Sequence, residues 1–140
     1  MSEELSKAVE YIDSMDFHEI IEKLCSEDPL LCRRWNRLEA EAAVQFYKNF
    51  LFICRKYLDD SAHIAPSIEI DEVWHHHILD TQRYSDDCHQ IFGRYIHHFP
   101  YFGTRGNEDF RNLTTAFENF QRLHVAEFGC PVPSIWHTTA

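Results

Sequence analysis

The chain has 140 residues, the usual length of one domain, and 44% of them are apolar, including 11 Phe, 6 Tyr and 3 Trp. This composition excludes an intrinsically disordered chain, because the apolar residues suffice to build a core. With 13 basic and 23 acidic residues the net charge is −10, which argues against nucleic acid or a membrane surface as the partner.

The first residues and the cysteines lead us to expect a soluble cytoplasmic protein. Residues 1–7 lack the basic and apolar regions of a signal peptide, and no stretch approaches the roughly 18 apolar residues of a membrane span. The five cysteines form no C-x-x-C pair. Reduced thiols are therefore expected in place of a disulfide framework or a zinc ribbon.

Helical patterns begin near the N-terminus. Apolar residues recur every three or four positions over residues 5–24, which predicts two short helices or one bent helix. Asp28 and Pro29 then supply an N-cap and a first helical position. The spacing predicts a long helix over 29–58. Because its second half is apolar nearly all round, we expect this helix at the centre of a bundle.

The middle of the chain holds a loop and a second helical region. Residues 59–67 carry turn residues, and helical periodicity resumes over 68–79. Asp80 offers another N-cap, with helix continuing to Phe92. The region is therefore one long helix or two helices joined at Asp80, and Gly93 is expected to end it.

The last predicted helix has Asn107 as its cap and ends at Gly129, and residues 130–140 form an extended tail. No strand pattern of convincing length is present, and four glycines are too few for the hairpins of a sheet. We therefore predict an all-α fold in which residues 1–140 form one domain, a bundle of five or six helices around helix 29–58.

Six of the ten histidines fall between positions 75 and 98. On a helix, Asp71 and His75 stand one turn apart, a spacing at which a carboxylate and an imidazole bind one metal ion or each other. Glu72 and His76 repeat this spacing on the next face. His77 lies about 200° around the helix from His75, so the two cannot ligate one ion unless the helix breaks.

A transition-metal site is the leading prediction for this region. His97 and His98 follow a turn and can return one more imidazole to the first set. Two or three histidines with a carboxylate suit iron, zinc, manganese or copper. Neither H-E-x-x-H nor a pair of E-x-x-H motifs is present. The candidate metal ligands are Asp71, His75, His77, His97 and His98.

A second polar stripe joins His77, Asp80, Tyr84 and Asp87 at spacings of 3, 4 and 3, if the helix continues through Asp80. Burying such a stripe is costly unless its groups are hydrogen-bonded or bind metal. Tyr84 and Asp87 are the candidate catalytic residues, placed beside the metal in an oxidation or hydrolysis of a small substrate.

One known family has a similar motif. The residues Asp71, Trp74, His75, His77, Tyr84, Asp87 and Cys88 resemble the D-x-x-W-H-x-H motif, with its following tyrosine, acidic residue and cysteine, of the glycine-rich domain-containing protein-like family. The resemblance covers about residues 66–103. It implies that His75 and His77 belong to the motif and His76 does not. It implies no reaction, because that family is mostly a domain of unassigned function.

Two other interpretations stay open. In the first, the His, Asp and Tyr side chains form a structural hydrogen-bond network in a non-catalytic module, and the aromatic segment 97–102 binds a protein partner. In the second, ten histidines offset ten negative charges in a pH-responsive switch. The sequence leaves open whether the protein is an enzyme or a binding module, and whether its partner is a small molecule or a protein.

Overall fold

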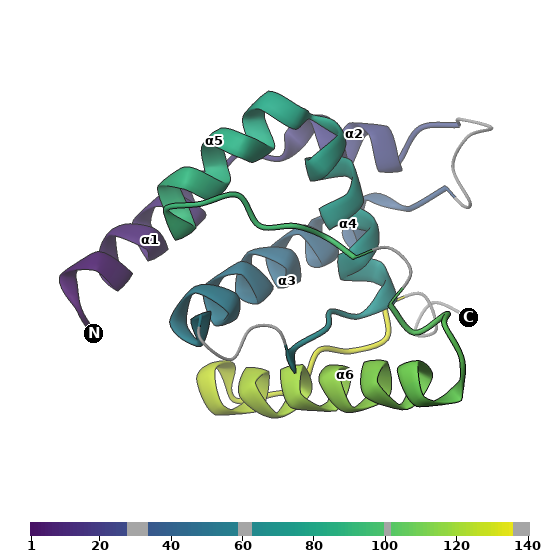
Figure 1. Cartoon of the computed structure of the whole chain (residues 1–140). Coiled ribbons are helices and arrows are strands. Elements are labelled where there is room, and N and C mark those ends of the chain that lie inside the picture. Colours follow the sequence, from purple (N-terminus) through teal and green to yellow (C-terminus); the bar gives the residue numbers. More distant parts are fainter. Residues whose placement is uncertain (28–33, 59–62, 100–101, 136–140) are drawn as a thin grey trace.

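The computed structural model describes residues 1–27, 34–58, 63–99 and 102–135 (Figure 1). All regular secondary structure in this part of the chain is helical. The helices are α1 (Glu3–Ser14), α2 (His18–Leu24), α3 (Arg37–Lys56), α4 (Ile68–Leu79), α5 (Thr81–Phe92) and α6 (Asn107–Phe128). The predicted all-α bundle is confirmed. None of these helices is both long enough and apolar enough to span a lipid bilayer.

The N-terminal region forms two helices and not one bent helix. Two contacts define the break between them. The Lys48 ammonium donates to the carbonyl of Met15 (2.7 Å), just past the end of α1. The Asp16 carboxylate then accepts from the backbone N–H of His18 (2.9 Å), the first residue of α2. These bonds satisfy backbone groups that a continuous helix would pair internally.

The central helix is shorter than predicted, because α3 begins at Arg37 and residues 34–36 are not helical. Its N-cap is Asn36, whose side chain accepts from the backbone N–H of Glu39 (2.8 Å). In turn, the Glu39 carboxylate accepts a hydrogen bond from the Asn36 N–H (2.9 Å), which completes a capping box. The predicted start at Asp28 and Pro29 lies outside the described residues.

Two helices, α4 and α5, meet at Asp80. Ser67 caps α4, since its hydroxyl accepts from the Ile70 N–H (3.3 Å). Asp80 occupies the N-cap position of α5, as predicted, but its side chain makes no capping bond. The predicted end at Gly93 is confirmed, with the left-handed backbone (φ 75°) that glycine adopts without strain.

The last helix differs from prediction by one residue at its start. Gly106 is the N-cap residue of α6, and Asn107 is already helical. The helix ends at Gly129, also left-handed (φ 83°), as predicted. Residues 131–134 carry no regular structure. They run back along α6 (Figure 1), where the Gln121 side chain bonds both the N–H and the carbonyl of Val132 (2.7 and 2.9 Å).

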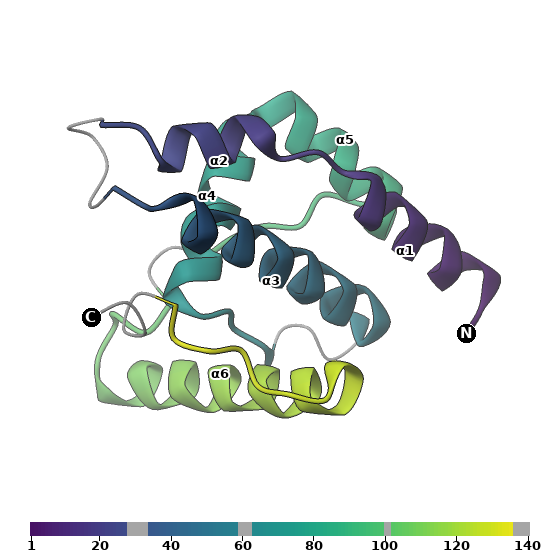
Figure 2. The ribbon, with the colours of Figure 1, turned by 180° about the vertical axis from the view of Figure 1, so that it is seen from behind.

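Helix α3 lies at the centre of the bundle, in contact with α1, α2, α4 and α6. Helix α6 follows one side of α3, while α1, α2 and α5 lie on the other side (Figures 1 and 2). Helix α5 packs mainly on α1 and α4, and the Arg55 guanidinium of α3 donates to the Ile91 carbonyl of α5 (3.0 Å). This arrangement places the histidine-rich helix α4 between the centre of the bundle and α5.

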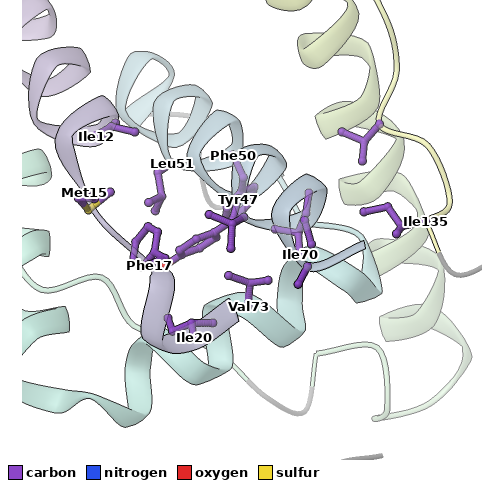
Figure 3. Close-up of a cluster of buried hydrophobic side chains, with 14 of the residues drawn as sticks. Ile12, Met15, Phe17, Ile20, Tyr47, Phe50, Leu51, Ile70, Val73 and Ile135 are labelled. Atoms are coloured by element: carbon purple, nitrogen blue, oxygen red, sulfur yellow. The ribbon is translucent and has the colours of Figure 1, made fainter. Parts of the chain in front are cut away.

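The core gathers where α1, α2, α3 and α4 meet (Figure 3). Phe17, Tyr47 and Val73 come from three different segments and point toward one another in Figure 3, and Tyr47 and Val73 are fully buried. The C-terminal segment adds Ile135 to the same buried cluster (Figure 3). The polar end of Tyr47 is therefore inside the core and needs a buried partner.

Candidate functional site

His77 supplies the partner of Tyr47. Its ring on α4 is only 1% exposed. The ring Nδ1 lies 2.7 Å from the Tyr47 hydroxyl, and Nε2 lies 2.7 Å from Oδ2 of Asp87 on α5. The Phe17 and Tyr84 rings each meet the imidazole edge-on, at a centroid distance of 4.9 Å. Helices α3, α4 and α5 are thus joined through one histidine.

The Asp87 carboxylate extends this network to α1. Its Oδ1 accepts a hydrogen bond from the Tyr11 hydroxyl (2.6 Å), and the Arg83 guanidinium lies 3.6 Å from Oδ2. Burial by itself disfavours the charged carboxylate, but the hydrogen bonds from His77 and Tyr11 outweigh it, so the pKa of Asp87 lies below its ordinary value. Asp87 is therefore an ionised acceptor.

The partners assign the protons on the His77 ring. Because Asp87 only accepts, Nε2 carries a proton and donates it. Burial holds the pKa of Tyr47 well above its ordinary value, so its hydroxyl stays protonated and donates to Nδ1. Both ring nitrogens of His77 are then used by protein groups, as in a structural network.

A second group of bonds joins α4, α5 and the segment that follows Gly93. The indole N–H of Trp74 donates to the Tyr84 hydroxyl (3.0 Å), which itself donates to the carbonyl of Ile96 (2.6 Å). Burial raises the pKa of the Tyr84 hydroxyl far above its ordinary range, so it acts as a neutral hydrogen-bonding group. Tyr84 thereby ties the extended segment 94–98 to the helices.

Cys88 lies next to this tyrosine and is 3% exposed. Burial raises the pKa of its thiol, although the Ile96 backbone and the Tyr84 hydroxyl favour the thiolate. A protonated, buried thiol is a poor nucleophile. Cys88 therefore belongs to the packing of α5 against segment 94–98.

Asp71 pairs with His98 and not with His75. The His98 Nε2 lies 2.6 Å from Oδ1 of Asp71, and the His98 ring meets the Trp74 indole edge-on at 4.6 Å. Both side chains keep some exposure to solvent, 17% for His98 and 46% for Asp71. This carboxylate–imidazole pair is the accessible part of the site.

The remaining predicted ligands lie apart. His75 is exposed on the opposite face of α4 from His77, as the helical geometry required. Its ring is 6.1 Å from that of His76, which pairs with Glu72 (3.5 Å). His97 is exposed beside the Tyr95 ring. The structure thus brings together only Asp71 and His98 from the predicted metal set. Nowhere in the described ranges do three His, Cys, Asp or Glu side chains gather as metal ligands would.

A cleft of about 490 Å³ opens beside Asp71 and His98. Most of its lining is apolar or aromatic, including Phe50, Leu58, Ile64, Trp74, Phe92 and Leu113. Arg94 and His97 also line it. From the predicted protein-binding segment 97–102, Phe99 and Phe102 face this cleft, and Pro100 and Tyr101 lie outside the described residues.

Several of these residues had no signal in the sequence. Tyr11 and Tyr47 lie in helices whose pattern indicates core packing, and nothing in that pattern marks a tyrosine that bonds to Asp87 or His77. Arg94 follows the helix-ending Gly93 as an ordinary loop residue. The Asp80 side chain, by contrast, is exposed and does not join the predicted polar stripe.

The geometry defines a class of protein: an all-helical bundle with a buried His–Asp–Tyr network beside an apolar cleft. The chain belongs to the UCP032817-like family, an uncharacterised family whose match covers residues 7–119. The matched range contains every residue of the network and of the Asp71–His98 pair. No curated protein and no solved structure matches the chain.

Proposed function

We propose that this protein is a binding module whose cleft holds a small, largely apolar ligand, and that the buried His–Asp–Tyr network is structural. The observation that carries the proposal is the cleft itself. Its volume of about 490 Å³ falls within the usual range of ligand pockets, about 300–1,000 Å³. An apolar lining with a few convergent polar groups is also typical of such pockets.

The Asp71–His98 pair supplies the polar contact. The Asp71 carboxylate accepts a hydrogen bond from the Nε2–H group of His98 (2.6 Å), which leaves the other ring nitrogen, Nδ1, as a hydrogen-bond acceptor. Within the described part of the chain, that nitrogen makes no hydrogen bond. A ligand hydroxyl or amide N–H is the matching donor. Asp71 has the role of fixing the tautomer and the orientation of the imidazole.

The Trp74–Tyr84–Ile96 bonds have the role of holding one wall of the cleft in place, and the buried network supports them through the edge-on contact of His77 with the Tyr84 ring (4.9 Å). Tyr84 bonds the Ile96 carbonyl, and Asp71 bonds His98, so the segment 94–98 is anchored at two points. A wall that is already ordered loses less conformational freedom when a ligand binds. This accounts for a buried polar network next to a binding cleft without giving it a catalytic role.

Titration with phenylalkanols, from 2-phenylethanol to 6-phenylhexan-1-ol, tests the proposal. We expect saturable binding, with amide shifts in ¹H–¹⁵N NMR spectra confined to the residues that line the cleft. In His98→Ala the loss of one hydrogen bond is expected to weaken binding about three- to tenfold.

His75→Ala is the matched control, because this histidine lies on the same helix, is exposed and does not line the cleft. The affinity of the His75→Ala variant for the phenylalkanols is expected to equal that of the wild type. Circular dichroism establishes that both variants are folded. The proposal fails if no phenylalkanol saturates, or if the shifts lie away from the cleft.

Metal binding at Asp71 and His98 is the second candidate, supported by the pairing of a carboxylate with an imidazole at an accessible position. In this proposal a divalent transition metal replaces the shared proton, and water or the ligand completes the coordination. Elemental analysis of protein purified without chelator is expected to find stoichiometric metal that Asp71→Asn and His98→Ala remove and His75→Ala retains. Absence of metal after loading with zinc or iron contradicts this second candidate.

The resemblance to the glycine-rich domain-containing protein-like family stays a prediction and adds no reaction to either candidate function.

A further inference from the structure

The ionisable residues that line the cleft are less acidic than the chain as a whole. The chain has a net charge of −10. The cleft is lined by Arg94, His97 and His98 against a single carboxylate, Asp71. That carboxylate is already hydrogen-bonded to His98. With histidine neutral, as in that net charge, Arg94 and Asp71 balance each other in sign; because Asp71 is engaged by His98, the Arg94 guanidinium is the charge left for a ligand.

Arg94 is the centre of this local charge. It is exposed and makes no ion pair or hydrogen bond with any residue that the structure describes. Of the arginines that the structure describes, four have a carboxylate oxygen within 4.0 Å, and two others bond an uncharged oxygen; Arg111 shares the unengaged state of Arg94 but does not line the cleft. The paired ones are Arg34, Arg37, Arg83 and Arg105, and the other two are Arg55 and Arg122. The guanidinium at the cleft thus keeps its donors available in a planar arrangement that matches a carboxylate.

We propose that the natural ligand of the cleft is an apolar monocarboxylate, whose carboxylate pairs with Arg94 and whose hydrocarbon or aromatic body packs against Phe50, Trp74 and Phe92. This inference rests on the proposed function and names the chemical class of its ligand. The apolar part of the lining excludes a small, highly charged anion such as phosphate, since such a ligand leaves most of the cleft uncovered.

The deep part of the cleft is suited to the uncharged body of this ligand. Cys54 lines it and is buried, and burial raises the pKa of the thiol to about 12. The thiol is thus neutral at physiological pH and does not repel the ligand. Segment 94–98, which carries Arg94 and both cleft histidines, is held by the Ile96 and His98 bonds described above.

Three probes with one body and three head groups test the inference: 4-phenylbutyrate, 4-phenylbutan-1-ol and 4-phenylbutylammonium. Isothermal titration calorimetry at low ionic strength measures each affinity. We expect the carboxylate to bind about tenfold more tightly than the alcohol, because a charge-assisted hydrogen bond to Arg94 at a solvent-exposed position changes the affinity by about that factor. The ammonium is expected to bind most weakly, because it carries the same charge as the guanidinium.

Two variants locate the effect. Arg94→Gln is expected to abolish the preference for the carboxylate while leaving the affinity for the alcohol unchanged. Arg111→Gln is the matched control, because Arg111 is exposed on α6 and does not line the cleft, and it is expected to keep the full preference.

The outcomes separate the two proposals. If the alcohol binds in the cleft but the carboxylate binds no more tightly, or if Arg94→Gln retains the preference, the ligand class is wrong and the binding function stands. If none of the three probes binds, both proposals are overturned.

Discussion

Replacing His77 with alanine is expected to lower the free energy of unfolding by about 3–5 kcal/mol. The substitution removes the hydrogen bond to the Asp87 carboxylate and the acceptor of the Tyr47 hydroxyl, both of which are buried. It also leaves a cavity where the Phe17 and Tyr84 rings met the imidazole. Urea denaturation followed by circular dichroism measures the loss.

His75→Ala is the control for this prediction, two residues away on the same helix. His75 is exposed, so the change is expected to stay within about 0.5 kcal/mol. Equal losses for the two variants would contradict the buried network. Tyr47→Phe adds an internal check, because it keeps the ring and removes only the hydroxyl that bonds His77, with an expected loss of about 1–3 kcal/mol.

Replacing Phe120 with alanine is expected to cost a similar amount, about 3–5 kcal/mol. Phe120 is fully buried on α6, and its ring meets Phe50 of α3 edge-on at a centroid distance of 5.4 Å. Its loss removes one of the aromatic contacts through which α6 packs on the central helix, next to that of Phe52 with Phe128. Thermal and chemical unfolding both report this change.

Phe110→Ala provides the comparison, because Phe110 is the same residue type on the same helix but is 60% exposed. We expect a loss below about 0.5 kcal/mol for this variant. A loss at Phe110 as large as that at Phe120 would mean that α6 packs on α3 through a different face from the one described.

The helices were largely predictable because their start and stop signals are local. Gly93 and Gly129 end α5 and α6 in the left-handed conformation that favours glycine. The start of α3 was not predictable in this way. The helical pattern put the start at Asp28 and Pro29, whereas α3 begins after Asn36, which forms the capping box with Glu39. The Trp35 N–H also bonds the Leu24 carbonyl at the end of α2 (3.0 Å), a tertiary contact that no local pattern reveals.

The site was predictable only as far as helix geometry reaches. The 3.6-residue period correctly separates His75 from His77, and it placed Asp71 at a spacing from His75 at which the two can bind one metal ion or each other. The structure pairs Asp71 with His98 instead. A periodic pattern tells which residues share a face of one helix, but it cannot tell which segment packs against that face.

The sequence by itself determined the all-helical class, the bounds of α4, α5 and α6 to within about a residue, and the set of polar residues that needs partners. The tertiary structure alone decided which residues are their hydrogen-bond partners. Tyr47 is 30 residues from His77, and Tyr11 is 76 residues from Asp87, so only the packing of α1, α3, α4 and α5 brings them within hydrogen-bond distance. The same packing places Asp71, Arg94 and His98 on the cleft, whereas the buried His77 has both ring nitrogens occupied.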